Sequence, residues 1–209
     1  MIEIKNNMLY MGDLVKTFNT PHMRSGRNIC DFVIIHYTGS HGSFKGSQSW
    51  AADPTSKVSW HITIGRGGEV NQCEHGFRSI LWHAGKSSWH SAQVNRTYEN
   101  LNKYSIGIEL ANSGQLIKDG NKFYNRYDGE IESRWVGYCE YTNTYWERYR
   151  PQQLKQCIDI SLALCKQYKC VDILGHEEIA PGRKTDPGPM FPIIELRKTL
   201  HSQEWYKWK

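Results

Sequence analysis

Residues 175–189 constrain the fold more than any other stretch, because three glycines and three prolines fall within these fifteen residues. Proline is excluded from helix interiors and central strands, so we expect an irregular loop that something other than its own backbone holds in shape. A bound metal ion would do so. His176 and Asp186 offer an imidazole and a carboxylate, both good zinc ligands, and Lys184 would place a positive charge beside the same ion.

A third metal ligand is available in His36, which ends the apolar run 32–35. A continuous apolar run with β-branched residues is typical of a strand buried on both faces. Binding sites gather at the carboxyl ends of strands in open α/β sheets, which favours a functional role for His36. The alternative is a core histidine that is satisfied by hydrogen bonds.

The remaining pattern alternates strands, hairpins and helices and therefore predicts an α/β domain. We expect short strands at 3–4 and 8–10, a short helix before Pro54, a hairpin joining 58–64 to 69–72, a Ser/Asn-rich loop over 82–104, a strand at 105–110, a helix from Pro151 to about 168, a strand at 171–174 and a last helix over 191–201.

Five further side chains are candidates for a site. Glu109 is a lone carboxylate in an apolar strand, which is costly to bury unless it is paired or belongs to a site. Trp82 and His83 open the long loop, where an aromatic face can pack on a sugar or simply join the core. His61, which follows Trp60, either contacts substrate or makes a hydrogen bond within the core.

Four blocks in this order resemble the type 2 N-acetylmuramoyl-L-alanine amidases, a family of phage endolysins, bacterial cell-wall and recycling amidases, and animal peptidoglycan recognition proteins. The blocks are 33–38, 82–85, 105–110 and 175–189, and the resemblance extends over about 30–195. Four ordered blocks are far more specific than any one of them. The resemblance implies a single domain with a central mixed β-sheet flanked by helices.

The resemblance also implies a reaction, hydrolysis of the amide between N-acetylmuramic acid and L-alanine. One zinc ion would be held by His36, His176 and Asp186, leaving a fourth position open. The carboxylate at Glu109 would act on the zinc-bound water, and Lys184 would stabilise the oxyanion.

The substrate groove would be bordered by Trp82 and His83, and lined by the strand that carries Trp60 and His61. Some family members carry a tyrosine before the strand histidine and a cysteine as third ligand, where this chain has Trp60 and Asp186. Because tryptophan cannot donate as a tyrosine hydroxyl does, more of the oxyanion stabilisation would fall on Lys184.

The chain divides, on this interpretation, into an N-terminal arm (1–29), a catalytic domain (30–201) with an insertion or flap at 111–150, and a basic aromatic tail (202–209). A formal net charge of +5 favours an anionic partner without identifying it. The six cysteines are expected to be free thiols, mostly buried. With no signal-peptide pattern or transmembrane segment, we expect a monomer that is cytoplasmic as synthesised.

The favoured function is a phage or prophage endolysin, which would reach the peptidoglycan through holin-mediated release. One alternative is a cytoplasmic amidase that recycles anhydro-muropeptides. A second is a non-catalytic peptidoglycan-binding module, although such a module usually loses a metal ligand or the carboxylate. A nucleic-acid-binding protein is the third, but no recognised nucleic-acid motif is present, so we expect no nucleic-acid partner.

Overall fold

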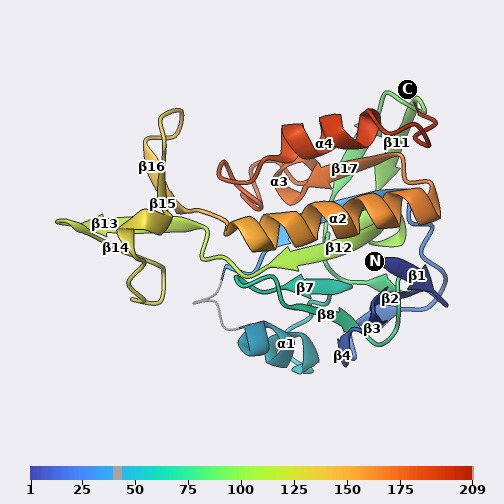
Figure 1. The fold of residues 1–209 in the computed structure, drawn as a ribbon, viewed down its shortest axis with the longest axis horizontal. Helices are drawn as coiled ribbons and strands as arrows, with labels where there is room; N and C mark the ends of the chain where they lie inside the picture. The colour runs from blue at the N-terminus through green and yellow to red at the C-terminus, as the bar shows by residue number, and fades with distance from the viewer. Residues whose placement is uncertain (40–43, 209) are drawn as a thin grey trace.

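The computed structural model describes residues 1–39 and 44–208, and the last tail residue, 209, lies outside this range. Its centre is a six-stranded mixed sheet in the order β17-β6-β12-β7-β8-β4 (Figure 1). These strands are Asp172–Gly175 (β17), Phe32–Tyr37 (β6), Ser105–Leu110 (β12), Ile62–Ile64 (β7), Val70–Cys73 (β8) and Lys16–Phe18 (β4). The predicted α/β fold with a central mixed sheet is confirmed.

The two central strands run parallel and place their side chains alternately on the two faces of the sheet. One face, carrying Val33 and Ile35, packs beneath helix α2 (Pro151–Tyr168) in the larger apolar core. The opposite face carries Phe32 and Ile34, which pack in a second apolar cluster. His36 follows at the next alternate position of β6, so it projects from this second face.

Helices and short strands complete the main body. Helix α4 (Ile193–His201) lies beside β17, α1 (Phe44–Ala52) lies near the β7–β8 hairpin, and α3 (His176–Ile179) follows β17 directly. The smaller strands are β1 (Glu3–Lys5), β2 (Met8–Met11), β3 (Asp13–Leu14), β5 (Met23–Arg24) and β9 (Ile80–Leu81). Among helices in the described ranges, none is both long and apolar enough to cross a membrane.

The loop expected over 82–104 contains a hairpin instead, formed by β10 (Ser88–Ser91) and β11 (Arg96–Glu99). Trp89 lies opposite Tyr98, a cross-strand aromatic pair that stabilises a hairpin although the segment is rich in serine and asparagine. Asn95 adopts a left-handed backbone conformation in the turn. The hairpin is followed by a short 3-10 helix, Leu101–Lys103.

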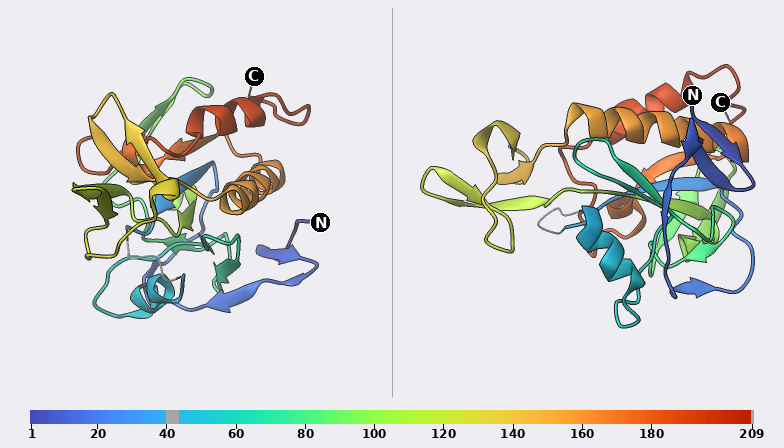
Figure 2. Two further views of the ribbon diagram at one scale, coloured as in Figure 1. Left: turned by 60° about the vertical axis from the view of Figure 1, so that its left-hand side comes forward. Right: turned by 60° about the horizontal axis from the view of Figure 1, so that its bottom comes forward.

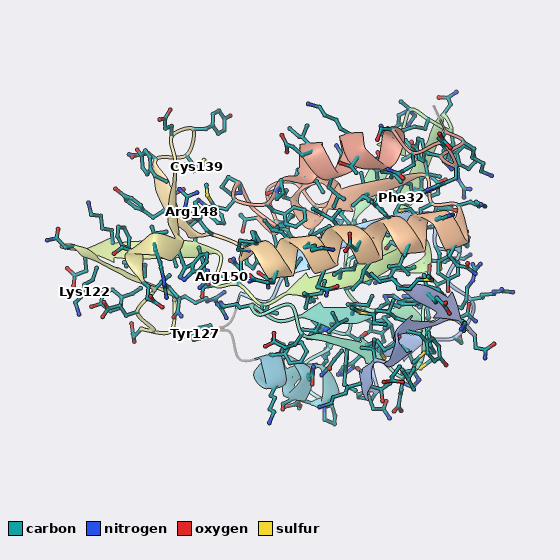
Figure 3. All side chains as sticks on the ribbon, viewed as in Figure 1. Phe32, Lys122, Tyr127, Cys139, Arg148 and Arg150 are labelled. Atoms are coloured by element: carbon teal, nitrogen blue, oxygen red, sulfur yellow. The ribbon has the colours of Figure 1, made fainter. Side chains whose placement is uncertain are left out.

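Residues 111–150 form a small sheet that projects from the main body, at the end away from both termini (Figures 1 and 2). Its order is β14-β13-β16-β15, from Lys122–Tyr124, Gln115–Asp119, Thr144–Glu147 and Val136–Cys139, with a 3-10 helix at Ser133–Trp135. Lys122 and Cys139 lie on this projection (Figure 3). The sequence analysis predicted an insertion or flap at these residues but did not predict that it forms a sheet.

A buried ion pair joins the projecting sheet to the main body. Glu147, whose side chain is fully buried, accepts two hydrogen bonds of 2.7 Å from Arg66 and one of 2.7 Å from the Ser113 backbone N–H. Burial alone raises the pKa of Glu147, but these donors outweigh it and the pKa lies below its usual value.

Replacing Glu147 by leucine is therefore expected to destabilise the protein by about 3 kcal/mol, because Arg66 and Arg150 lose the buried carboxylate that both contact. A urea denaturation series at pH 7 measures the loss. The matched control is Glu132→Leu, since the Glu132–Arg134 pair is exposed and such pairs contribute under about 1 kcal/mol. The difference between wild type and Glu147→Leu should shrink as the pH falls through the lowered pKa of Glu147. An equal effect of both substitutions would contradict the prediction.

The structure also locates the six cysteines. All six cysteines lie in the described ranges and are free thiols, five of them buried, as predicted.

In the tail, the Tyr206 hydroxyl donates to the Val171 carbonyl (2.7 Å) and the Trp208 indole N–H donates to the Lys169 carbonyl (3.2 Å). The described part of the tail is therefore docked on the core.

Candidate metal centre and active site

Three side chains from two parts of the chain converge at the carboxyl end of the central strands. His36 is the last residue but one of β6, His176 begins α3 directly after β17, and Asp186 lies ten residues further on. The His36 Nδ1 and His176 Nδ1 atoms are 2.9 Å apart, and each lies 2.9 Å from Asp186 Oδ2. All three residues are buried and form a cluster able to hold a metal ion.

Contacts within the protein, and not a metal ion alone, hold the loop that carries His176 and Asp186 in shape. Its first residues form α3, one helical turn, so the expectation that glycine and proline exclude all helix here is wrong for residues 176–179. Glu178 caps this turn by accepting the Gly175 N–H (2.7 Å) and pairs with Arg197 on α4 (2.7 Å). The prolines and the other two glycines follow this turn, which is why it ends after four residues.

The chemistry of the cluster fits a divalent metal such as zinc. The His176 Nε2 atom lies 3.1 Å from the Ala84 carbonyl oxygen, which can only accept, so Nε2 carries the proton and Nδ1 presents a lone pair to the cluster. Burial, followed by repulsion from His176, lowers the pKa of His36 to about 4, which keeps its imidazole neutral at pH 7. Although burial opposes it, the two imidazoles beside the Asp186 carboxylate hold its pKa below its usual range. Neutral imidazoles and an ionised carboxylate are the forms that bind zinc.

Glu109 lies beside the cluster because β12 pairs with β6 and places Glu109 opposite His36. Its Oε2 atom is buried and has no hydrogen-bond partner among the described residues. Burial raises the pKa of Glu109 to about 8, and the negative charge of Asp186 adds to the rise. A buried carboxylate oxygen without a partner is costly, so the presence of Glu109 Oε2 at the cluster indicates a chemical role.

A cavity of about 600 Å³ opens over the cluster, and the three ligand residues and Glu109 line it. Lys184, which is exposed, also lines the cavity. The predicted ligands, carboxylate and cation therefore share one cavity.

The residues predicted to contact substrate are placed differently from one another. Trp82 and Trp60 line the cavity, but Trp60 is almost fully buried and its indole N–H donates to Thr63 Oγ1 (2.6 Å). His61 lies in the core instead of the cavity wall. Its Nδ1 accepts the Gly107 N–H (3.0 Å) and its Nε2 meets the Ser79 carbonyl (3.1 Å), so neither ring nitrogen is free for substrate.

His83 reaches the cavity with only 8% of its surface exposed, and both ring nitrogens face the protein. Its Nδ1 lies 3.0 Å from His36 Nε2, so it stands behind a residue of the cluster. Burial lowers its pKa well below the usual value, and the nearby histidines add to this effect. His83 is therefore neutral, and it lines the cavity that it was expected to border while its Nδ1 faces His36.

Two lining residues that sequence reasoning missed come from the projecting sheet. Arg126 and Tyr127 lie in the turn after β14, where Asn125 Oδ1 accepts the Tyr127 and Gly129 N–H groups. Both are exposed, and Figure 3 shows Tyr127 at the side of the projection that faces the main body. The turn is recognisable in the sequence, but its position beside the cavity depends on how the projection is attached.

Comparison with known proteins agrees with this arrangement. A family profile described as N-acetylmuramoyl-L-alanine amidase matches residues 25–189. The chain is 32% identical over 121 residues to N-acetylmuramoyl-L-alanine amidase AmiD of Escherichia coli (strain K12), covering 57% of this chain and 34% of that protein. It is 31% identical over 143 residues to 1,6-anhydro-N-acetylmuramyl-L-alanine amidase AmpD of Citrobacter freundii, covering 68% and 56%. The aligned regions thus span about a third of the length of AmiD and just over half of the length of AmpD.

Solved structures share the fold. A selenomethionine derivative of AmpD superposes with a TM-score of 0.60 at 23% identity, covering 94% of this chain and 98% of that chain. E. coli AmiD, solved with the substrate anhydro-N-acetylmuramic acid-L-Ala-D-gamma-Glu-L-Lys, superposes with a TM-score of 0.58 at 25% identity, covering 94% and 65%.

Proposed function

Because the chain belongs to the N-acetylmuramoyl-L-alanine amidase family, we propose that it hydrolyses the amide between N-acetylmuramic acid and L-alanine, with one zinc ion held by His36, His176 and Asp186. The observation that carries the proposal is the convergence of these three ligand atoms, 2.9 Å apart, beside the unpartnered Oε2 atom of Glu109 in the same cavity. Three protein ligands that leave a position open are typical of catalytic zinc sites.

The side chains of the cavity have separate tasks in this reaction. A bound zinc ion would supply Lewis-acid chemistry, which lowers the pKa of water and polarises a carbonyl. Glu109 takes a proton from the attacking water and later gives it to the leaving amine of L-alanine. Its position in register with His36 keeps the carboxylate near the ligands. Lys184 lines the same cavity and places a positive charge near the carbonyl oxygen as negative charge develops there.

The substrate we propose is a soluble 1,6-anhydro-muropeptide. The AmpD relative is named for this compound, and the AmiD structure contains an anhydro-muropeptide. These comparisons favour the recycling alternative over the endolysin that the sequence analysis placed first.

The test separates the two substrates. The zinc-loaded protein is incubated with anhydro-N-acetylmuramic acid-L-Ala-D-γ-Glu-L-Lys and, separately, with intact peptidoglycan, and the products are identified by mass spectrometry. Release of the free tripeptide from the soluble compound is expected. Cleavage of intact wall alone would favour the endolysin role. Binding of both materials with no cleavage of either, by protein carrying one zinc per chain, would leave a binding module and overturn the proposal.

A further inference from the structure

Two consecutive residues of the 82–85 block contact the metal-ligating histidines from behind. The His36 Nε2 atom lies 3.0 Å from His83 Nδ1, and the His176 Nε2 atom lies 3.1 Å from the Ala84 carbonyl oxygen. We propose that His83 and Ala84 form a positioning unit that sets the tautomer and ring orientation of both histidines, so that each presents its Nδ1 lone pair to the metal. This inference rests on the metal site of the proposed function.

A backbone carbonyl on β12 sets the tautomer of His83, the residue that contacts His36. His83 Nε2 lies 3.3 Å from the Ser105 carbonyl oxygen and 3.4 Å from Ser105 Oγ. The carbonyl can only accept, and the Ser105 hydroxyl gives its own proton to the Leu101 carbonyl (2.6 Å). His83 Nε2 therefore carries the proton.

The tautomer of His83 determines the tautomer of His36. A neutral imidazole has one N–H, so His83 Nδ1 is an acceptor. The hydrogen bond of 3.0 Å then requires the proton on His36 Nε2, which leaves His36 Nδ1 free to bind metal. The Ala84 carbonyl fixes His176 in the same tautomer directly. Both Nδ1 lone pairs and the Asp186 carboxylate thus point at one another across 2.9 Å, an arrangement that a cation stabilises.

The positioning unit is itself held from three sides. Asn102 Oδ1 accepts the backbone N–H groups of His83 (3.1 Å) and Ala84 (2.7 Å). Arg183 Nη2 donates to the carbonyls of Ala84 (2.9 Å) and Lys86 (2.7 Å). The His83 ring packs on Gly107 of β12, where an added Cβ would lie only 2.6 Å from His83 Cγ. The glycine thus makes room for the ring.

Zinc affinity tests the positioning role without using the amidase reaction. We expect His83→Leu, which removes the acceptor, to weaken zinc binding by about 10- to 100-fold in competition with a chromophoric chelator. His83→Asn keeps an acceptor near the position of Nδ1 and is expected to stay within about threefold of wild type. His75→Gln is the matched control, because His75 Nε2 also meets a backbone carbonyl, that of Thr20 (2.9 Å), but His75 does not line the cavity.

The zinc affinities of the variants distinguish failure of the positioning role from failure of the proposed function. Wild-type affinity in His83→Leu, or equal losses in His83→Leu and His83→Asn, would overturn the positioning role. Normal zinc binding and the expected variant order in a protein that cleaves no muropeptide would overturn the proposed function and leave the positioning role standing. A wild-type protein that binds no zinc would overturn both.

Nitrogen-15 NMR of the zinc-loaded wild-type protein tests the same inference without any substitution. The expected signature is a scalar coupling across the hydrogen bond between His36 Nε2 and His83 Nδ1, with His83 protonated on Nε2. Protonation of His83 on Nδ1 would overturn the proposal even if the His83 variants fail to fold.

Discussion

Glu109→Gln is expected to lower kcat/KM for an anhydro-muropeptide by about a thousandfold while zinc binding stays within about twofold of wild type. The amide keeps the size of the side chain but can neither accept the proton of the attacking water nor return it to the leaving amine. Steady-state kinetics by chromatographic detection of the released peptide, together with metal analysis of each preparation, measure both quantities. An active Glu109→Gln protein would remove the carboxylate from the mechanism.

The same substitution is expected to stabilise the metal-free protein. Burial raises the pKa of Glu109 from 4.5 to about 8, so between these values the native state holds a proton that the unfolded chain has released. Stability due to this group therefore falls as the pH rises from about 4.5 towards 8. The resulting loss in the free energy of unfolding reaches up to about 3 kcal/mol at pH 7, and Glu109→Gln removes this loss.

Urea denaturation at several pH values checks this second effect. Wild type and Glu109→Gln should have similar free energies of unfolding near pH 4.5, and the variant should be the more stable of the two by pH 8. Loss of activity together with a gain in stability distinguishes a catalytic carboxylate from a structural one, whose removal destabilises the protein. A variant less stable than wild type across the whole range would contradict the raised pKa.

The three residues of the cluster could be identified as candidates from the sequence because their chemistry and position are both local properties. His36 follows an apolar run, and one loop rich in glycine and proline carries both His176 and Asp186. Glu109 is similar, since a lone carboxylate in a buried strand is unusual whatever surrounds it. For His36 and Glu109 the local pattern left a site and a structural role both open, and the resemblance to the type 2 amidases decided for a site.

The role of His83 could not be obtained in this way. It depends on the Ser105 carbonyl and on the missing side chain of Gly107, both on a strand more than twenty residues further along the chain. A sequence shows that a histidine lies in a loop, but not which nitrogen faces which partner.

The projecting sheet was missed for a related reason. Residues 111–150 are polar and aromatic without a clear alternation, and their strands pair with one another away from the main core. Arg126 and Tyr127 reach the cavity only because the projection is fixed to the main body, where Glu147 meets Arg66.

Zinc is expected to raise the melting temperature of the wild-type protein and to leave that of Asp186→Ala unchanged. A ligand that binds only the native state stabilises it by about 2.7 kcal/mol when its free concentration is a hundred times the dissociation constant. For a chain of this length, that corresponds to a rise of about 5–10 °C. Asp186→Ala leaves two imidazoles, which bind zinc far more weakly than the complete set.

Differential scanning fluorimetry with a zinc titration, repeated after chelation, measures this shift, and activity is followed in the same samples. Glu177→Gln is the matched control, because Glu177 is a carboxylate of the same loop that does not belong to the cluster. It should retain the full shift. Chelation is expected to abolish amidase activity, and added zinc should restore it in wild type and Glu177→Gln but not in Asp186→Ala. A zinc-dependent rise in Asp186→Ala equal to that of wild type would place the metal elsewhere, because the structure offers Asp186 as the carboxylate that lies within 2.9 Å of both histidines.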